Sequence, residues 1–297
     1  AITDLTRGEI EATYALARDL KEKTKRGEAH PVLAGKTLAM IFQKPSARTR
    51  VSFEAGMFQL GGHALYLAPT DIQMGKREST ADIARVLSRY VDGIMARVFA
   101  HEDVLELAAY ASVPVVNGLS DLLHPCQVLA DLFTISEHKG RAENFTIAWV
   151  GDGNNVANSW LNMASRFALD LRLAVPEGYD PDPEILSSAK KAGLSTISIV
   201  RDPREAVRGA DVIYTDVWAS MGQEAEAEKR KAVFRPYQVN AELVALARPD
   251  VVVMHCLPAH RGDEITDEVM DGPHSIVFDQ AENRLHVQKA LLVKLMS

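Results

Sequence analysis

The chain has 297 residues, of which 47% are hydrophobic and 25% are charged, and its formal net charge is −7. This length suffices for two domains of ordinary size, and the apolar fraction supports a filled core in each. The negative charge argues against nucleic acid or an anionic membrane as a general partner, so an anion would need a local group of arginines. The two cysteines, Cys126 and Cys256, are too few for a disulfide framework and lack metal-ligand spacing.

The first residues carry no basic segment followed by an apolar core, and no apolar stretch reaches the length of a membrane span. We therefore expect a cytoplasmic protein without a membrane partner. An organelle matrix, reached with a transit peptide that is later removed, stays an alternative.

The first half of the chain alternates between strand and helix patterns. A capping box at Thr6 and Glu9 predicts a helix that runs up to Gly27. The strand at 37–42 leads through a loop into a helix at 46–60, which Gly61 and Gly62 close. Further strands are predicted at 64–68, 93–99 and 113–116, separated by helical segments. A long helix starts at Pro125 and ends near Gly140.

A second alternating series follows. Its strands are predicted at 146–150, 171–175, 196–200, 212–215, 251–255 and 276–278. Helices are predicted at 155–168 and 183–192, and one amphipathic helix at 281–296 ends the chain. Such alternation is typical of parallel sheets covered by helices on both faces. We expect an α/β protein with two doubly wound parallel-sheet domains of similar size joined by helices. We place them at residues 1–137 and 138–280. The pattern alone leaves open which domain receives the helix at 281–297, and we expect it to pack back on the first.

An anion site is predicted between the first strand and the helix that follows it. There the sequence reads Ser46, Ala47, Arg48, Thr49 and Arg50. The start of a helix carries unpaired N–H groups and partial positive charge, which hydroxyls and one guanidinium would complete as a phosphate cradle. Arg48 and Arg50 point to different sides of the helix, so we assign Arg48 to the anion and Arg50 to a salt bridge or backing role.

An amino-acid site is predicted after the strand at 212–215. Asp216 and Ser220 come directly after this buried strand, and ligands bind at the carboxyl ends of strands in open α/β sheets. A carboxylate in this place can hold an α-ammonium group. The loop 151–156 has two glycines of a dinucleotide fingerprint, but Val156 stands where the third glycine would be.

In this order the motifs resemble those of the aspartate and ornithine carbamoyltransferases, and the resemblance covers nearly the whole chain. The phosphate loop of that family usually reads Ser-Thr-Arg-Thr-Arg, so Ala47 replaces a hydroxyl here. Residues 124–127 match the family's His-Pro-x-Gln. Residues 255–258 read His-Cys-Leu-Pro, which is similar to the ornithine enzymes, whereas the aspartate enzymes usually carry His-Pro-Leu-Pro.

The resemblance implies roles for particular residues. The expected contacts of carbamoyl phosphate are Ser46, Ala47, Arg48, Thr49, Gln73, Arg97, His124, Gln127, Cys256, Leu257 and Arg284. The expected contacts of L-ornithine are Asn155, Asp216, Ser220 and Met221. The expected catalytic residues are Arg48, Arg97, His124, Asp216 and Cys256.

The resemblance further implies that residues 1–137 bind carbamoyl phosphate and residues 138–280 bind ornithine. The reaction would give L-citrulline and phosphate by direct attack of the amine, with domain closure and without a cofactor or metal. The family is built on a trimer, in which a loop around Gln73 would reach the neighbouring subunit. No nucleic acid or membrane is expected as a partner.

Three other functions stay open at this point. A sibling transcarbamoylase would use putrescine or an acylated ornithine, although putrescine has no α-carboxylate to recognise. A nucleotide-dependent oxidoreductase would need the missing third glycine and a ribose-binding acid. A two-domain binding protein would hold ornithine without turnover. Citrulline formation compared with ornithine, putrescine and aspartate would separate these alternatives.

Overall fold

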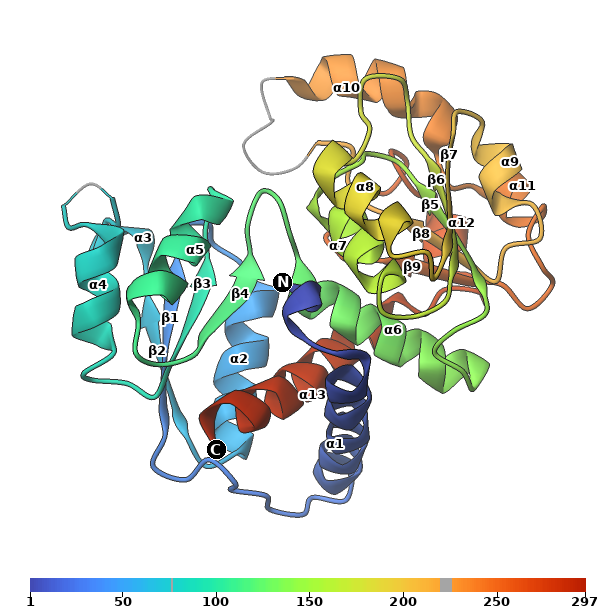
Figure 1. Ribbon diagram of the computed structural model, residues 1–297. Helices are drawn as coiled ribbons and strands as arrows, with labels where there is room; N and C mark the ends of the chain where they lie inside the picture. Colours follow the sequence, from blue (N-terminus) through green and yellow to red (C-terminus); the bar gives the residue numbers. More distant parts are fainter. Residues whose placement is uncertain (76, 220–225) are drawn as a thin grey trace. The chain divides into compact units, whose positions relative to one another are not determined.

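The structure is a computed structural model, which describes residues 1–75, 77–219 and 226–297. The chain divides into two compact units, one formed by Ala1–Phe133 with Glu282–Ser297 and the other by Thr134–Ala281. Two helices contain the boundaries between them, α6 (Pro125–Lys139) and α13 (Val277–Met296) (Figure 1). The first unit is therefore built from both ends of the described chain.

A parallel four-stranded sheet organises the first unit. Its strands are β1 (Thr37–Phe42), β2 (His63–Leu67), β3 (Gly93–Arg97) and β4 (Val115–Leu119), in the order β2-β1-β3-β4. Its shorter elements and helices are η1 (Ile2–Asp4), α1 (Arg7–Lys25), α2 (Ala47–Gln59), α3 (Pro69–Ile72), α4 (Thr80–Leu87) and α5 (His101–Tyr110). The strand order reverses between β1 and β3, and a reversal of this kind places a ligand crevice at the carboxyl ends of the two strands.

Both faces of this sheet are covered: successive strand residues point to opposite sides, and those of β1 from Leu38 to Phe42 are all buried. Ala39, Ile41 and Ile94 share one core cluster with residues of α4 and α5 such as Ile83 and Leu107. Elsewhere in the unit, α13 contacts α2 and β3: a Cβ at Gly56 would lie 3.2 Å from Lys289, and one at Gly93 would lie 3.1 Å from Met296. The closing helix thus belongs to the core of the first unit.

A parallel five-stranded sheet organises the second unit. Its strands are β5 (Thr146–Val150), β6 (Asp170–Ala174), β7 (Thr196–Val200), β8 (Val212–Thr215) and β9 (Val252–His255), in the order β7-β6-β5-β8-β9. Its helices are α7 (Asn155–Ala164), α8 (Pro183–Lys191), α9 (Pro203–Val207), α10 (Ala227–Phe234), η3 (Arg235–Tyr237), α11 (Ala241–Val244) and α12 (Asp267–Met270). Here the reversal falls between β5 and β8.

Aromatic packing on one face and aliphatic packing on the other hold this second sheet between helix layers. Trp149 of β5 stacks on Tyr214 of β8 with ring centroids 5.1 Å apart, and Trp160 of α7 meets Tyr214 edge-on. On the alternate positions, Ala148 and Ile213 share a core cluster with residues of α9, α11 and α12. The predicted class, α/β with two parallel sheets flanked by helices, is confirmed.

One predicted strand is wrong. Residues 276–278 do not form a strand, because α13 begins at Val277. Val253 of β9 donates its N–H to the carbonyl of His274 and accepts the N–H of Ile276, so an isolated bridge to β9 precedes the helix. A three-residue apolar run is compatible with either a strand or the buried first turn of a helix, and in this protein it leads into the helix. The predicted capping box of Thr6 and Glu9 is confirmed.

Candidate active site

The loop after β1 becomes the capped start of α2. Ser46 is the N-cap residue, and its hydroxyl accepts the N–H of Thr49 at 3.3 Å. Arg48 lies in the first turn and is exposed, whereas Arg50 binds Glu54 at 2.9 Å and stacks on Tyr66. The predicted salt-bridge role of Arg50 is thereby confirmed, and Arg48 remains available at the positive end of the helix.

Three buried side chains gather behind this helix start. Arg97 ends β3, His124 precedes α6, and Arg284 lies on α13; they are 6%, 5% and 4% exposed. Arg284 donates to the hydroxyl of Thr49 at 3.1 Å, which directs that hydroxyl into the protein. Four elements distant in sequence therefore deliver their functional groups to one place.

Electrostatics fix the protonation state of His124. Burial, then the guanidinium groups of Arg284, Arg97 and Arg48, hold the pKa of His124 well below its usual 6.5. Near neutral pH the imidazole is neutral, so it can donate one N–H without adding charge. A cluster of arginines around a neutral donor suits an anion that carries a polar carbonyl group.

Two amides lie close to this cluster. Gln127, one turn after His124 on α6, is 1% exposed, and its Nε2 donates to Asp131 at 2.8 Å. Asn117 of β4 is 6% exposed and stands beside Ala96 in the sheet, directly before Arg97. Neither side-chain atom of Asn117 has a hydrogen-bond partner among the described residues. Sequence reasoning missed Asn117 and Asp131; Asp131 could have been noticed from its i,i+4 spacing to Gln127 on a predicted helix.

Gln73 lies apart from this cluster in the sequence, at the end of α3. It adopts a left-handed conformation with φ of 43°, its side chain is exposed, and its Nε2 reaches the carbonyl of Thr70 at 3.4 Å. The residue is thus presented on the surface of the first unit.

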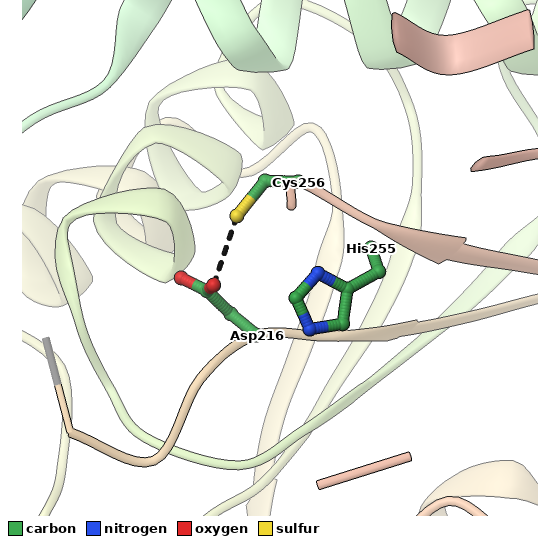
Figure 2. Close-up of side chains that lie close together, drawn as sticks. All are labelled: Asp216, His255 and Cys256. Carbon is green, nitrogen blue, oxygen red and sulfur yellow. Dashed lines mark hydrogen bonds between the residues drawn. The ribbon is translucent and has the colours of Figure 1, made fainter. Parts of the chain in front are cut away.

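In the second unit, Asp216 is the centre of a hydrogen-bonded group at the reversal between β5 and β8. It follows β8 and is 6% exposed. Its Oδ2 accepts from Nδ2 of Asn154 at 2.7 Å, and its Oδ1 accepts from the Val217 N–H and the Cys256 thiol, each at 2.8 Å. Figure 2 shows Cys256 turned toward this carboxylate.

Asn154 was missed by the sequence reasoning, which selected Asn155. Asn154 is the N-cap of α7, and its side-chain oxygen accepts from the N–H groups of Val156 and Ala157. Its amide nitrogen is then directed to Asp216. The signal was present, because Asn is a preferred residue directly before a helix.

The loop after β9 is held by a second buried pair. Nδ1 of His255 accepts the N–H of Leu257 at 2.8 Å, so its hydrogen is on Nε2, which faces Glu264 at 3.0 Å. His255 and Glu264 are both fully buried. Leu257 has a positive φ of 58°, a strained conformation that these bonds help to hold.

Asp216, His255 and Cys256 each offer a ligand atom, and these atoms lie within 4.8 Å of one another (Figure 2). Both ring nitrogens of His255 are engaged, by Leu257 and Glu264. The hydrogen bonds account for this grouping without a metal ion.

A buried ion pair supports the segment that follows Asp216. Arg230 of α10 binds both the carboxylate of Asp152 and the carbonyl of Trp218. Burial raises the pKa of Asp152 to about 6, although Arg230 opposes the shift. The predicted ornithine contacts Ser220 and Met221 lie outside the described residues.

The glycine-containing loop after β5 also has a structural explanation. A Cβ at Gly153 would lie 2.3 Å from the backbone nitrogen of Pro181 and 2.5 Å from the carbonyl of Tyr179. Gly153 is therefore required by close packing against the chain itself, which removes its weight as part of a dinucleotide fingerprint.

Comparison with known proteins places this geometry in a family. The family model for the carbamoyl-P binding domain of aspartate/ornithine carbamoyltransferase matches residues 1–137, and the model for the Asp/Orn binding domain matches residues 143–295. This chain belongs to the aspartate/ornithine carbamoyltransferase family.

Several carbamoyltransferases are similar over nearly their whole length. The ornithine carbamoyltransferases of Syntrophus aciditrophicus and Thermococcus kodakarensis are 59% and 58% identical to the chain, covering 98% and 99% of it and 97% and 95% of the relatives. The solved ornithine carbamoyltransferase from Pyrococcus furiosus superposes with a TM-score of 0.96 at 56% identity, covering 100% of this chain and 96% of that one. None of the helices described here has the length and apolar composition that crossing a membrane requires.

Proposed function

We propose that this member of the family is an ornithine carbamoyltransferase, which converts carbamoyl phosphate and L-ornithine to L-citrulline and phosphate. The observation that carries the proposal is its near full-length identity of 59% and 58% to relatives of that name. The reaction is of the kind used in arginine biosynthesis.

In this proposal the arginine cluster of the first unit binds carbamoyl phosphate. Arg48 and the N–H groups at the start of α2 bind the phosphate, with Ser46, Ala47 and Thr49 forming the loop. Arg97 and Arg284 add buried positive charge, and neutral His124 donates to the carbamoyl oxygen. These groups stabilise the negative charge that develops on that oxygen during attack.

The carboxylate of Asp216 binds the α-ammonium group of ornithine. Asn154 and Cys256 hold this carboxylate in a single orientation, which supports a selective site for an amino acid. Asn155, Ser220 and Met221 stay predicted contacts of the same substrate. Cys256 and Leu257 also stay predicted contacts of carbamoyl phosphate.

The chemical step needs no covalent enzyme intermediate. The neutral δ-amine of ornithine attacks the carbamoyl carbon, a tetrahedral centre forms, and the C–O bond to phosphate breaks. The departing phosphate takes the amine proton. Catalysis then comes from positioning the two substrates and from charge stabilisation, and closure of the domains over both substrates stays a prediction.

We further propose a cytoplasmic homotrimer in which Gln73 serves the site of a neighbouring subunit. The exposed position of Gln73 after α3 supports such a role. A cyclic trimer repeats one heterologous interface, so each site would combine the body of one chain with the loop of the next.

The test is citrulline formation from carbamoyl phosphate with ornithine, putrescine or aspartate as the acceptor. We expect turnover with ornithine and at least about a hundredfold lower kcat/KM with the other two, since putrescine lacks the α-carboxylate and aspartate lacks the δ-amine that attacks the carbamoyl carbon. Preference for putrescine would assign the chain to a sibling activity. Binding of ornithine without product would indicate a binding protein.

A further inference from the structure

We propose that Asp131 is a positioning residue that decides which end of the Gln127 amide faces the carbamoyl group. By this means the site would distinguish a carbamoyl phosphate from an acyl phosphate of the same shape. The inference rests on the proposed function and names a determinant of its substrate specificity.

The geometry starts from one face of α6. His124 directly precedes α6, and Gln127 and Asp131, four residues apart, lie on the same side of the helix. Gln127 is 1% exposed and Asp131 is fully buried. The amide of Gln127 therefore lies between a buried carboxylate on one side and the arginine-surrounded His124 on the other.

The chemistry of the pair fixes the orientation of the amide. The two atoms Nε2 of Gln127 and Oδ1 of Asp131 are 2.8 Å apart. The structure directs the NH₂ group of the amide to this carboxylate, whose oxygens can only accept hydrogen bonds when it is ionised. The carbonyl oxygen Oε1 of Gln127 then points away from Asp131.

That oxygen is buried and has no hydrogen-bond partner among the described residues. A buried acceptor without a donor is unfavourable, and such groups in proteins commonly serve a function. Its neighbour His124 feels the charges of Arg48, Arg97 and Arg284, which places Gln127 at the edge of the anion site. We infer that Oε1 accepts an N–H from the bound substrate.

Carbamoyl phosphate supplies that N–H, and acetyl phosphate does not. The two molecules differ in having NH₂ or CH₃ on the carbonyl carbon, groups of similar size. With Asp131 in place, the NH₂ group meets an acceptor and the methyl group leaves the acceptor unpaired. Sites that hydrogen-bond a substrate group reject analogues lacking it more strongly than apolar pockets reject by size. If the side-chain amide of Gln127 were rotated by a half turn, its NH₂ group would face the NH₂ group of carbamoyl phosphate, and neither could accept a hydrogen bond.

The experiment uses two phosphonates that cannot react, phosphonoacetamide and 2-oxopropylphosphonate, which differ only in NH₂ and CH₃. Their dissociation constants are measured by calorimetry with the full-length protein. We expect the wild type to bind the amide at least about tenfold more tightly than the ketone, corresponding to about 1.4 kcal/mol. In Asp131→Asn, whose side chain can donate as well as accept, this preference should fall at least about threefold.

The ketone reports on the integrity of the site. Its affinity should change less than about twofold in Asp131→Asn, because the phosphate contacts are untouched. In Gln127→Ala the preference should vanish, and adding Asp131→Asn should then have no further effect on it. Should Asp131→Asn fail to fold, Asp131→Ser carries the same expectation, since a hydroxyl also donates and accepts.

The chain offers a matched control. Asp103 accepts from Nε2 of Gln43 at 2.9 Å, but Oε1 of Gln43 already accepts the N–H of Phe99 at 2.8 Å. Asp103→Asn should leave the preference for the amide unchanged. An undiminished preference in Asp131→Asn, or equal loss of both analogues, would overturn the role of Asp131 while citrulline formation by the wild type stands. A wild type that neither binds phosphonoacetamide nor forms citrulline overturns the proposed function and this inference together.

Discussion

A single turn of α2 carries two arginines with different surroundings. Arg48 is exposed at the helix start, while Arg50 pairs with Glu54 and covers Tyr66. The positive charge of Arg50 is therefore compensated by the carboxylate of Glu54 on the same helix. The charge of Arg48 instead adds to that of Arg97 and Arg284 around His124.

Arg48→Ala should therefore reduce kcat/KM for carbamoyl phosphate by the equivalent of about 3 kcal/mol or more, above the loss of one ordinary charged hydrogen bond. Steady-state kinetics at saturating ornithine measure this. Arg50→Ala is the matched control, and we expect it to change kcat/KM by less than about threefold, since exposed ion pairs contribute little. Wild-type turnover in Arg48→Ala would contradict the phosphate assignment.

Asp216 makes bonds that a neutral amide would partly keep. Asp216→Asn retains the size of the side chain but removes the negative charge that an α-ammonium group requires. Ornithine affinity should fall far more than carbamoyl phosphate affinity. A bisubstrate analogue without its α-amino group should bind the variant and the wild type almost equally, and competition binding gives the comparison. Equal losses for analogues with and without that amine would refute the role.

At the scale of elements, α13 is fixed to the first unit by a buried lysine. Nζ of Lys289 donates to Thr24 of α1 at 2.7 Å and to Gln59 of α2 at 2.8 Å. It also lies 3.1 Å from Nε2 of His30, whose Nδ1 faces the carbonyl of Glu28. The carbonyl accepts, so Nδ1 carries the hydrogen and Nε2 is free to accept from the ammonium group.

Burial lowers the pKa of Lys289 to about 8 from the usual 10.5. Between these two pH values the unfolded chain binds more protons at this site than the folded protein, so the contribution of Lys289 to the free energy of unfolding rises with pH. From pH 8 to pH 10 the wild type should gain on the order of 2 kcal/mol relative to Lys289→Met. Urea titrations of both proteins at several pH values measure the difference. Parallel pH profiles would show that Lys289 titrates normally.

The helices and strands were largely predictable, because a strong hydrophobic periodicity in the sequence indicates which element a segment forms. The strands at 37–42, 146–150 and 212–215 have the predicted bounds. The strand predicted at 113–116 runs instead over Val115–Leu119, since Asn117 and Gly118 do not look strand-like in isolation. The error at 276–278 is of the same kind, because a short apolar run does not show whether it pairs with a neighbouring strand or packs as part of a helix.

The site was predictable only in part. Asp216, Cys256 and Arg97 follow or end apolar runs, and sequence order alone places them at strand ends. The contact of Asp216 with Asn154 and Cys256 joins positions 62 and 40 residues apart and depends on β5, β8 and β9 being neighbours. The meeting of Arg284 with Thr49 depends on the return of α13. No local pattern encodes these pairings.

At the scale of the whole molecule, the proposed trimer predicts complementation between inactive variants. Arg48→Ala should inactivate the site in its own subunit, whereas Gln73→Ala should inactivate only the site of the neighbouring subunit. Co-refolding the two should produce sites with both groups intact, roughly a quarter of the total by counting on a ring. Activity well above either parent is expected, measured as citrulline formed per protein. If subunit exchange is verified by mass and the mixture merely averages its parents, the loop serves its own chain.

The return of α13 also bears on how the protein is made. Residues 134–281 form a continuous unit, but the first unit also requires residues 282–297. Domains commonly fold from the N-terminus onward during synthesis. In this protein the order of completion is reversed. On the ribosome, the second unit can complete its core before the first unit, because the first unit still lacks residues 282–297. Until Lys289 and Arg284 emerge, the nascent first half lacks both the helix that fills its core and a cation of its anion site, and a chaperone that binds apolar surface would have longest access to that half.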